Sequence, residues 1–338
     1  MQAYRYQQAG VDIDKNERFV AAIKRLLGRH PSVRPAGNIG GFAGLYPYGN
    51  DRYLCAASDG VGTKVLLAHQ YRRYEQIGID LVAMSVNDLL CCGARPLFFL
   101  DYLAYSNLGL EAMEAIIAGI IAGCEQAGCV LLGGETAEMP GMYQAGVFDL
   151  AGFALGEVSK TTMIRGEQVK AGDCLVGLAA SGFHANGYSL LRSLHKEVGE
   201  PEEWVEGLLT ATKIYVRPLL EILSNFPGTI KGMAHITGSG FHNIARINSQ
   251  VDYVFEYLPS FTELPEIFSL VLGTSPIPRE ELYSTFNMGV GMVLVVEKTK
   301  VDALIVALAE RGVPSWQLGH LVKGEGNLVG LQLKNSGN

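Results

Sequence analysis

The segment RYLCAASDGVGTKVLLAHQY, residues 52–71, joins a strand pattern to a helix pattern through a glycine-rich turn. Residues 52–58 form a short apolar run, which predicts a strand, and the spacing from Lys64 to about residue 74 predicts a helix. The turn between them resembles a phosphate-binding loop with its order changed, because the usual loop reads G-x-x-x-x-G-K-S/T. Taken alone, the turn has two interpretations: a nucleotide site of another design, or a simple connection between a strand and a helix.

The alternation of strand and helix patterns continues to about residue 158 and then starts again. In the first part, the pattern predicts helices at 79–94 and 110–128 and strands at 96–105, 129–135 and 147–158. In the second part, it predicts strands at 174–182 and 287–297 and helices at 186–198, 214–226 and 301–312. A chain of 338 residues is also longer than one simple core requires. The sequence therefore predicts an α/β (α+β) protein of two α/β domains, residues 1–165 and 166–338.

The composition argues against several classes of function. The net charge of -7 argues against nonspecific binding of nucleic acid, which requires a basic surface. No apolar run reaches the roughly 18 residues of a membrane span, and the N-terminal residues lack the apolar core of a secretory signal. The six cysteines form no C-x-x-C pair, so we expect reduced thiols in a cytoplasmic protein. The expected partners are therefore small molecules rather than a nucleic acid or a membrane.

The predicted helix at 79–94 carries the strongest physical signal. Asp80, Asn87 and Asp88 lie at positions i, i+7 and i+8, so they share one face of the helix. Their neighbours are apolar, and no lysine or arginine occurs between Glu75 and Arg95. Two carboxylates in such surroundings are unfavourable unless a cation pairs with them. The alternative is that Asp80 caps the helix and Asp88 is solvated.

Further acidic residues stand at or near the predicted ends of strands. Asp59 leads the glycine-rich turn, Asp101 interrupts an apolar strand, and Glu135 follows the double glycine of CVLLGGE. Strand ends of α/β proteins border the crevice in which ligands bind. Oxygen ligands without histidine or cysteine suit Mg²⁺, which completes its shell with phosphate oxygens, so the expected ligand is ATP with Mg²⁺. Lys64 would then neutralise a phosphate group.

Seven segments together resemble a known family. They are ASDGVGTK (57–64), GIDLVAMSVNDLL (78–90), GARPLFFLDY (93–102), GGETAEMPGMY (133–143), FDLAGFALG (148–156), SGFHANGYSL (181–190) and FNMGVGM (286–292). In order and spacing they resemble the phosphoribosylformylglycinamidine cyclo-ligases, also called aminoimidazole ribonucleotide synthetases. The resemblance runs from about residue 9 to about residue 319, which is nearly the whole chain.

The resemblance implies an enzyme of de novo purine synthesis that closes the imidazole ring of formylglycinamidine ribonucleotide with ATP. ATP phosphorylates the formamide oxygen, an amidine nitrogen attacks the same carbon, and phosphate leaves. The family also implies a homodimer in which the N-terminal domains bind ATP and Mg²⁺ and pair through their sheets, while the C-terminal domain completes the active-site cleft. In such chemistry, positioning and charge neutralisation supply most of the rate.

The resemblance also implies roles for residues of this sequence. The expected metal ligands are Asp59, Asp80, Asp88 and Glu135. The expected ATP and phosphate contacts are Gly40, Gly41, Asp59, Gly60, Gly62, Thr63, Lys64, Asn87 and Asn186. The expected catalytic residues are His184, Lys64 and Asp88. His184 would contact substrate or phosphate or act as a general acid or base.

Two other features of the resemblance concern loops. Gly40 and Gly41 belong to GNIGGFAG (37–44), which resembles a glycine-rich loop that closes over the nucleotide; by itself such a segment is typical of a flexible surface loop. His235, ahead of ITGSGF, carries a weaker signal than His184. The sequence departs from the family pattern at Ser239, where a glycine is usual, and this departure affects the expected substrate pocket.

Other ATP-using enzymes of the same fold are the nearest alternatives. Selenophosphate synthetase requires a cysteine in the glycine-rich loop, and the hydrogenase-maturation enzyme requires one at the C-terminus, but this sequence has neither. Thiamine-monophosphate kinase is not expected to contain GGETAEMPGMY. A catalytically silent nucleotide-binding regulator would be expected to lose some of the acidic residues or the lysine. The sequence retains all four: Asp59, Lys64, Asp80 and Asp88.

Overall fold

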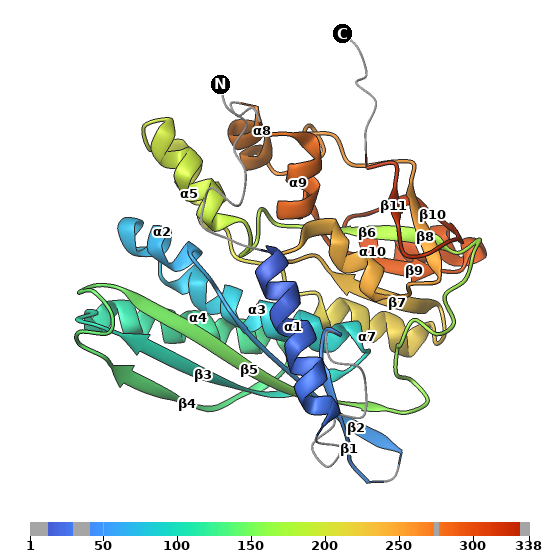
Figure 1. The fold of residues 1–338 in the computed structure, drawn as a ribbon, viewed down its shortest axis with the longest axis horizontal. Helices are drawn as coiled ribbons and strands as arrows, with labels where there is room; N and C mark the ends of the chain where they lie inside the picture. Colours follow the sequence, from blue (N-terminus) through green and yellow to red (C-terminus); the bar gives the residue numbers. More distant parts are fainter. Residues whose placement is uncertain (1–12, 30–40, 50, 274–276, 332–338) are drawn as a thin grey trace.

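Two β-sheets organise the chain, one in each half (Figure 1). The structure is a computed structural model that describes residues 13–29, 41–49, 51–273 and 277–331. The strands of the first sheet run in the order β1-β2-β5-β3-β4, and those of the second in the order β11-β8-β10-β6-β9-β7. Helices accompany both sheets, as predicted for an α/β (α+β) protein.

The first sheet is formed by the first half of the chain. Its strands are β1 (Gly44–Pro47), β2 (Arg52–Gly60), β3 (Arg95–Tyr105), β4 (Val130–Glu138) and β5 (Phe148–Ser159). The helices of this half are α1 (Ile13–Gly28), α2 (Lys64–Tyr71), α3 (Glu75–Cys91) and α4 (Leu110–Ala127). β3 and β4 are parallel and are connected by α4, whereas β5 pairs antiparallel with both β2 and β3. The sheet is therefore mixed, with its long antiparallel strand in the middle.

Helices α3 and α4 lie on one face of this sheet and approach each other through glycines. A Cβ atom added to Gly119 of α4 would overlap the carbonyl oxygen of Glu75, and one added to Gly78 of α3 would overlap that of Ile116. The sheet also contributes a glycine, because a Cβ atom at Gly152 of β5 would overlap the ring of Phe99 on β3 and press on Leu81 of α3. These close contacts place α3 directly over the middle of the sheet.

The other face of the first sheet carries exposed apolar side chains. The edge strand β4 exposes 61% of Val130 and 62% of Leu132, and β5 exposes 46% of Phe153. Figure 1 shows β3, β4 and β5 at the lower left, with α4 above them on the other side. Large apolar side chains gathered on an edge strand are typical of an interaction surface.

The second sheet is formed by the second half of the chain. Its strands are β6 (Cys174–Ala179), β7 (Ile230–His235), β8 (Val251–Phe255), β9 (Val290–Val296), β10 (Ser315–Lys323) and β11 (Leu328–Val329). The helices are α5 (Tyr188–Glu197), α6 (Val205–Leu209), α7 (Val216–Asn225), α8 (Glu266–Leu272), α9 (Arg279–Thr285) and α10 (Val301–Glu310), with 3-10 helices η3 (Glu202–Trp204), η4 (Gly240–Arg246) and η5 (Lys298–Lys300). β9 is buried along its whole length between β6 and β7, which explains its uninterrupted apolar sequence.

Most predicted elements agree with the structure in type and differ at their ends. The helix predicted from Lys64 to residue 74 ends at Tyr71, because Arg72 adopts a left-handed conformation with φ 54°. β7, β8 and β10 were not predicted, since their sequences are short or interrupted by glycine and polar residues. Residues 160–173 connect the two sheets and contain the expected domain boundary. No helix in the described part of the chain has the length and apolarity to span a membrane.

Candidate active site

The polar face of α3 lies at the boundary between the two halves of the chain. Asp80, Asn87 and Asp88 share this face, and each bonds to a residue of the second half. The bonding partners lie in the segment 212–215 and at the end of β7. The face that the sequence predicted to bind metal therefore makes most of its contacts with the other half of the protein.

Lys64, the first residue of α2, and Asp80 of α3 form an ion pair that is closed to solvent. Lys64 Nζ lies 2.7 Å from Asp80 Oδ2, and neither side chain has any exposed surface. The ammonium group also donates hydrogen bonds of 2.8 Å to the carbonyl oxygens of His184 and Thr210. Asp80 Oδ1 accepts bonds from the backbone and the hydroxyl of Thr212, at 2.8 and 2.6 Å. Burial lowers the pKa of Lys64 and raises the pKa of Asp80, and their mutual attraction opposes both shifts.

This geometry differs from the role predicted for the pair. A lysine ammonium group has three donors, and here Asp80 and two carbonyl oxygens take all three. Lys64 therefore has no donor left for a phosphate, and Asp80 is too enclosed to reach a metal ion. Their predicted roles as phosphate and metal ligands would require the ion pair to open. In the structure, the pair fixes two loops of the second half against α2 and α3.

Asn87, the residue before Asp88 on α3, makes a second connection. Its Oδ1 accepts a hydrogen bond of 3.0 Å from the backbone of Tyr215, and its Nδ2 donates one of 2.9 Å to the carbonyl oxygen of Lys213. The side chain is fully buried, so both ends of the amide are satisfied by the backbone of the second half. Asn87 thus holds the same chain segment that the Lys64–Asp80 pair holds.

Asp88 is the member of this face that remains open. Its Oδ1 lies 2.9 Å from Nδ1 of His235, the last residue of β7, and 19% of its side chain is exposed. His235 itself is fully buried, and its Nε2 lies 3.5 Å from Asn87 Nδ2. The Asp88 carboxylate is therefore oriented from the protein side by a histidine and retains access to solvent on the other side.

Asp59 lies near the end of β2, close to Asp88. Its Oδ1 accepts a hydrogen bond of 2.8 Å from the backbone of Gly60. Burial and, next in size, the charge of Asp88 raise the pKa of Asp59 to about 6, while the Gly60 bond and His235 act in the opposite direction. The two carboxylates are thus close enough to repel each other.

The pair of Asp59 and Asp88 has the chemistry of a divalent-cation site. Both side chains are partly exposed, and a cation between them would relieve their repulsion. Across the described residues, no group of three or more His, Cys, Asp or Glu side chains is arranged to hold a metal ion alone. Two carboxylates that leave positions for phosphate and water match the usual binding of Mg²⁺.

His184 is held in an unusual conformation next to this network. Its φ of 62° is left-handed, which is rare for a residue with a side chain, and Lys64 binds its carbonyl oxygen. Its Nε2 accepts the backbone N–H of Ser181 at 3.3 Å, so in the neutral ring the hydrogen is on Nδ1. Nδ1 is buried and has no hydrogen-bond partner among the described residues. Burial, followed by the charges of His235 and Lys64, lowers the pKa of His184 well below its ordinary value.

These features favour one of the two roles expected for His184. A ring that stays neutral and accepts a backbone hydrogen bond at Nε2 is a poor general acid or base. Its Nδ1–H is an unused donor, which suits contact with an oxygen atom. The geometry therefore favours a hydrogen-bonding role over proton transfer.

Glu135 lies apart from the other predicted metal ligands. One row of paired residues crosses four strands of the first sheet and consists of Asp59, Gly152, Asp101 and Gly134. This row lies on the face of the sheet that Gly152 turns to α3. Glu135 follows Gly134, so its exposed side chain points to the opposite face of the sheet. Three strand spacings, or about 14 Å, also separate β4 from β2. Within one chain, Glu135 and Asp59 therefore do not share a metal ion.

The glycine-rich turn lies beside the segment that contains His184. Thr63 Oγ1 lies 3.2 Å from Ser189 Oγ of α5, and Gly62 has the left-handed φ of 68° that the tight turn requires. Gly60 provides the backbone bond to Asp59 described above. Asn186 contacts the sulfur of Met84 at 4.0 Å. Gly41 begins a described segment, whereas Gly40 lies outside the described residues.

The partners of the α3 face could not be recognised from the sequence. His235 and Thr212 complete the bonds of Asp88 and Asp80, yet they lie 147 and 132 residues away along the chain. A polar histidine at the end of an apolar strand, just before a glycine-rich segment, was the available signal for His235. Thr212 had no distinguishing signal in the sequence.

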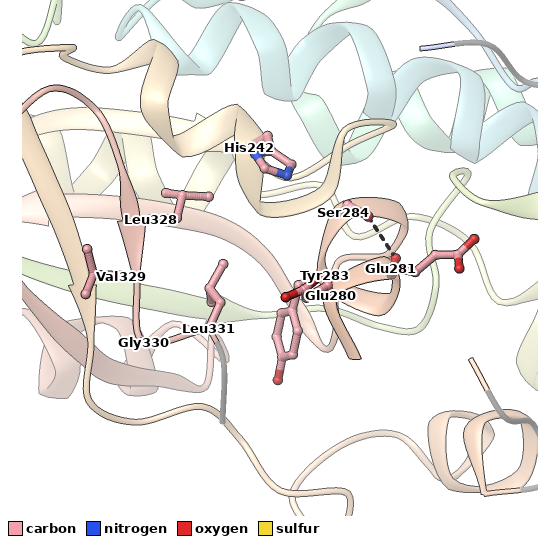
Figure 2. Close-up of a pocket in the computed structure, with 9 residues that line it drawn as sticks. All are labelled: His242, Glu280, Glu281, Tyr283, Ser284, Leu328, Val329, Gly330 and Leu331. Atoms are coloured by element: carbon pink, nitrogen blue, oxygen red, sulfur yellow. Dashed lines mark hydrogen bonds between the residues drawn. The ribbon is translucent and has the colours of Figure 1, made fainter. Parts of the chain in front are cut away.

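A separate pocket of about 690 Å³ lies between η4, α9 and β11 (Figure 2). One wall carries Glu280 and Glu281, and the other carries Leu328 and Leu331. None of the predicted site residues lines it. The pocket therefore belongs to a different part of the molecule from the acidic pair.

Comparison with protein families supports the resemblance along both halves of the chain. The family described as AIR synthase related protein, N-terminal domain, matches residues 40–158. The family described as AIR synthase related protein, C-terminal domain, matches residues 170–331. The two matches correspond to the two sheets.

Two relatives of high identity carry the same name. The phosphoribosylformylglycinamidine cyclo-ligase of Clostridium perfringens is 44% identical over 327 residues, covering 94% of this chain and 97% of that protein. The protein of the same name from Myxococcus xanthus is 43% identical over 345 residues, covering 95% and 96%.

A solved structure shares the fold at lower identity. AaThiL complexed with AMPPCP and TMP has a TM-score of 0.64 and 16% identity, covering 92% of this chain and 93% of that chain. At this identity the likeness concerns the fold alone. The near-complete coverage by relatives above 40% identity decides the family: this chain belongs to the phosphoribosylformylglycinamidine cyclo-ligases.

Proposed function

We propose that the chain converts formylglycinamidine ribonucleotide to 5-aminoimidazole ribonucleotide in de novo purine biosynthesis, with ATP converted to ADP and phosphate. The observation that carries this proposal is the identity of 43–44% over at least 94% of the chain to proteins named for this reaction. Asp59, Asp88 and His184 support it, because they would provide a cation site and a hydrogen-bond donor at one boundary of the fold.

The chemistry consists of two group transfers. The terminal phosphoryl group of ATP passes to the formamide oxygen of the substrate, and the bond to ADP breaks. An amidine nitrogen then attacks the former formyl carbon, the C–O bond breaks, and phosphate leaves with that oxygen. The nitrogen loses a proton as the ring becomes aromatic. Both steps depend on alignment and on neutralising phosphate charge.

We assign a separate role in this chemistry to each of these residues. Asp59 and Asp88 would hold Mg²⁺, which neutralises phosphate oxygens when it is bound. The backbone N–H groups of the turn from Gly60 to Thr63 would face the phosphates. His184 is as fully buried as Asp80, so its Nδ1–H would donate to an oxygen of the substrate or phosphate once the surrounding chain opens to admit that oxygen. AaThiL, which shares the fold, was solved with AMPPCP, an analogue of ATP, and this supports nucleotide binding on the same scaffold.

The remaining predicted features are part of the same proposal. The two copies of a homodimer would pair through the open face of the first sheet, which exposes Val130, Leu132 and Phe153. Glu135 lies on that face, so in the dimer it would be at the interface. Residues 1–165 would then form the nucleotide-binding and dimerisation domain, and residues 166–338 the domain that completes the cleft. The six free cysteines support a reducing compartment, and we keep the cytoplasm as the predicted location.

The test is product formation by the purified protein. ADP is measured together with aminoimidazole ribonucleotide, which forms a coloured derivative, with Mg²⁺-ATP and with or without formylglycinamidine ribonucleotide. The proposal predicts equal amounts of both products, and only when the substrate is present. Binding of ATP without either product would retain the nucleotide site and reject this substrate.

A further inference from the structure

His235 occupies a special position in the bonding of the α3 face. Asp80 is fully buried, with Oδ1 bonded to Thr212 and Oδ2 paired with Lys64, and Asn87 is fully buried and bonded at both of its polar atoms, so neither side chain is open to solvent. Asp88 is held by one oxygen only, and the atom that holds it is His235 Nδ1. The described residues provide no hydrogen bond to Asp88 Oδ2. The partly exposed carboxylate therefore depends on one histidine for its orientation.

The hydrogen-bond directions around His235 form one consistent chain. Asp88 is an acceptor as a carboxylate, so His235 Nδ1 carries the hydrogen and donates it. His235 Nε2 is then an acceptor, and the atom facing it at 3.5 Å is the donor Nδ2 of Asn87. Asn87 also donates to the carbonyl oxygen of Lys213. The chain of bonds thus runs from the second half, through α3 and His235, to the Asp88 carboxylate.

The backbone of His235 is rigid, which makes this orientation specific. His235 ends β7 and pairs with Met292 of the fully buried strand β9. The next residue, Ile236, donates a backbone hydrogen bond of 3.0 Å to Gly291. The imidazole is therefore fixed to the second sheet, whereas Asp88 belongs to the first half. Through the bond between them, the position of the second half determines how the Asp88 carboxylate of the first half is oriented.

We propose that His235 is a positioning residue for the metal–nucleotide site: it holds Asp88 Oδ1 so that Oδ2 faces the cation shared with Asp59. The inference rests on the proposed function, because it assumes that these two carboxylates bind Mg²⁺ with a nucleotide. Carboxylates that bind metal are usually held by hydrogen bonds of this kind, and their loss weakens metal binding by about 10- to 100-fold. His235 has no direct contact with substrate in this proposal.

Two amide substitutions separate orientation from packing. In His235→Asn, the amide nitrogen stands where Nδ1 stood and can still donate to Asp88. In His235→Gln, the amide nitrogen stands near the place of Nε2 and does not reach Asp88 in the same way. Both variants are polar and of similar size, so a difference between them reports the bond to Asp88. His320→Asn serves as the control, because His320 lies on β10 with a partly exposed side chain paired to Glu256.

The measurement is calorimetric binding of Mg²⁺ with AMPPCP to the full chain, together with the melting temperature and with KM and kcat. We expect His235→Gln to raise the Kd by about 10- to 100-fold, and His235→Asn to change it by less than about three-fold. KM for Mg²⁺-ATP should follow the same order. His320→Asn should match the wild type in all of these quantities.

Three results would overturn the inference. Equal weakening by Asn and Gln would show that donation to Asp88 is not what matters. A lower melting temperature in both variants, with Kd unchanged, would make His235 a structural residue. An unchanged Kd and melting temperature would remove it from the site altogether. Failure of the wild type itself to bind Mg²⁺-AMPPCP is a separate result, which would reject the proposed nucleotide site rather than the role of His235 alone.

Discussion

Asp80 and Asp88 of helix α3 have different surroundings, although the sequence suggested that both belong to one site. Asp80 is fully buried and neutralised by Lys64, with its other oxygen bonded to Thr212. Asp88, two turns along the same helix, is partly exposed and lies near a second carboxylate, Asp59. The first arrangement is closed and joins the two halves of the protein. The second has unbalanced negative charge and access to solvent.

On this difference rests our proposal that Lys64 and Asp80 form a structural ion pair and that Asp59 and Asp88 form the binding site. A buried carboxylate whose charge is already matched gains little from a metal ion. A pair of partly exposed carboxylates that repel each other gains more, because the cation removes the repulsion. Helical spacing places Asp80, Asn87 and Asp88 on one face, but it does not say which of the two carboxylates the protein itself neutralises. The following predictions test the division, in order of decreasing effect.

The largest effect is expected from Lys64→Met. The substitution leaves the Asp80 carboxylate buried without its partner, which should lower the free energy of unfolding by about 3–5 kcal/mol in urea titrations. Arg311→Met is the control, because its pair with Glu221 is exposed and should contribute about 1 kcal/mol or less. If Lys64→Met kept its stability and lost affinity for ATP, Lys64 would be the phosphate ligand that the sequence suggested.

The next effect concerns Asp88→Asn. The amide keeps an oxygen that accepts the bond from His235, so the fold should be preserved, but the charge that attracts a cation is lost. We expect kcat/KM to fall on the order of 100-fold or more, with little change in melting temperature. Activity close to that of the wild type would remove Asp88 from the cation site.

A smaller effect is expected at His184. His184→Asn keeps a donor in the position of Nδ1 and tolerates the left-handed backbone, whereas His184→Ala removes the donor. Turnover should fall by about 100-fold in the alanine variant and by about 10-fold or less in the asparagine variant. Equal losses in both variants would argue against a role for the donor.

The pH dependence of turnover provides a second test of His184. Because its pKa lies well below the ordinary value, the ring stays neutral near pH 6–8. The wild type and His184→Asn should therefore have rate profiles of the same shape in that range. An ionisation near pH 6.5 that disappears with the histidine would restore the general acid or base role.

The smallest effect is a gain of stability in Asp59→Asn. In the folded protein the pKa of Asp59 is raised to about 6, so the folded state binds a proton more tightly than the unfolded state does. Its contribution to stability is greatest below about pH 3.9, the ordinary value, and is lost as the pH rises through 6. At pH 8 the ionised carboxylate destabilises the fold, so Asp59→Asn should raise the free energy of unfolding by about 1 kcal/mol, with less gain at pH 5. A loss of stability at pH 8 would show that the Asp59 charge is matched within the protein.

The sequence predicted the order of elements in the first half because its patterns are local. The strand at 52–58, the turn after it and the helix at 79–94 correspond to β2, the glycine-rich turn and α3. The shared face of Asp80, Asn87 and Asp88 follows from helix geometry alone. β7 and β8 were missed, since short strands in the second half owe their stability to neighbours far away in the sequence.

The sequence predicted which residues belong to the candidate site, but not which residues they bond to. The expectation that a buried carboxylate needs a cation applies to Asp80, and the cation is Lys64 from the same motif that raised the question of a phosphate loop. Thr212 and His235 could not be assigned, because only the folded chain brings them to α3. Glu135 was predicted as a metal ligand because it lies near the end of a strand. Side chains alternate between the two faces of a strand, however, and Glu135 points to the face opposite Asp59.

The most direct test of this division is a crystal structure with Mg²⁺ and AMPPCP. The account predicts a metal ion bound by oxygens of Asp59 and Asp88, with the Lys64–Asp80 pair closed as described here. A metal ion bound by Asp80, or Lys64 turned away from Asp80 onto a phosphate group, would contradict it.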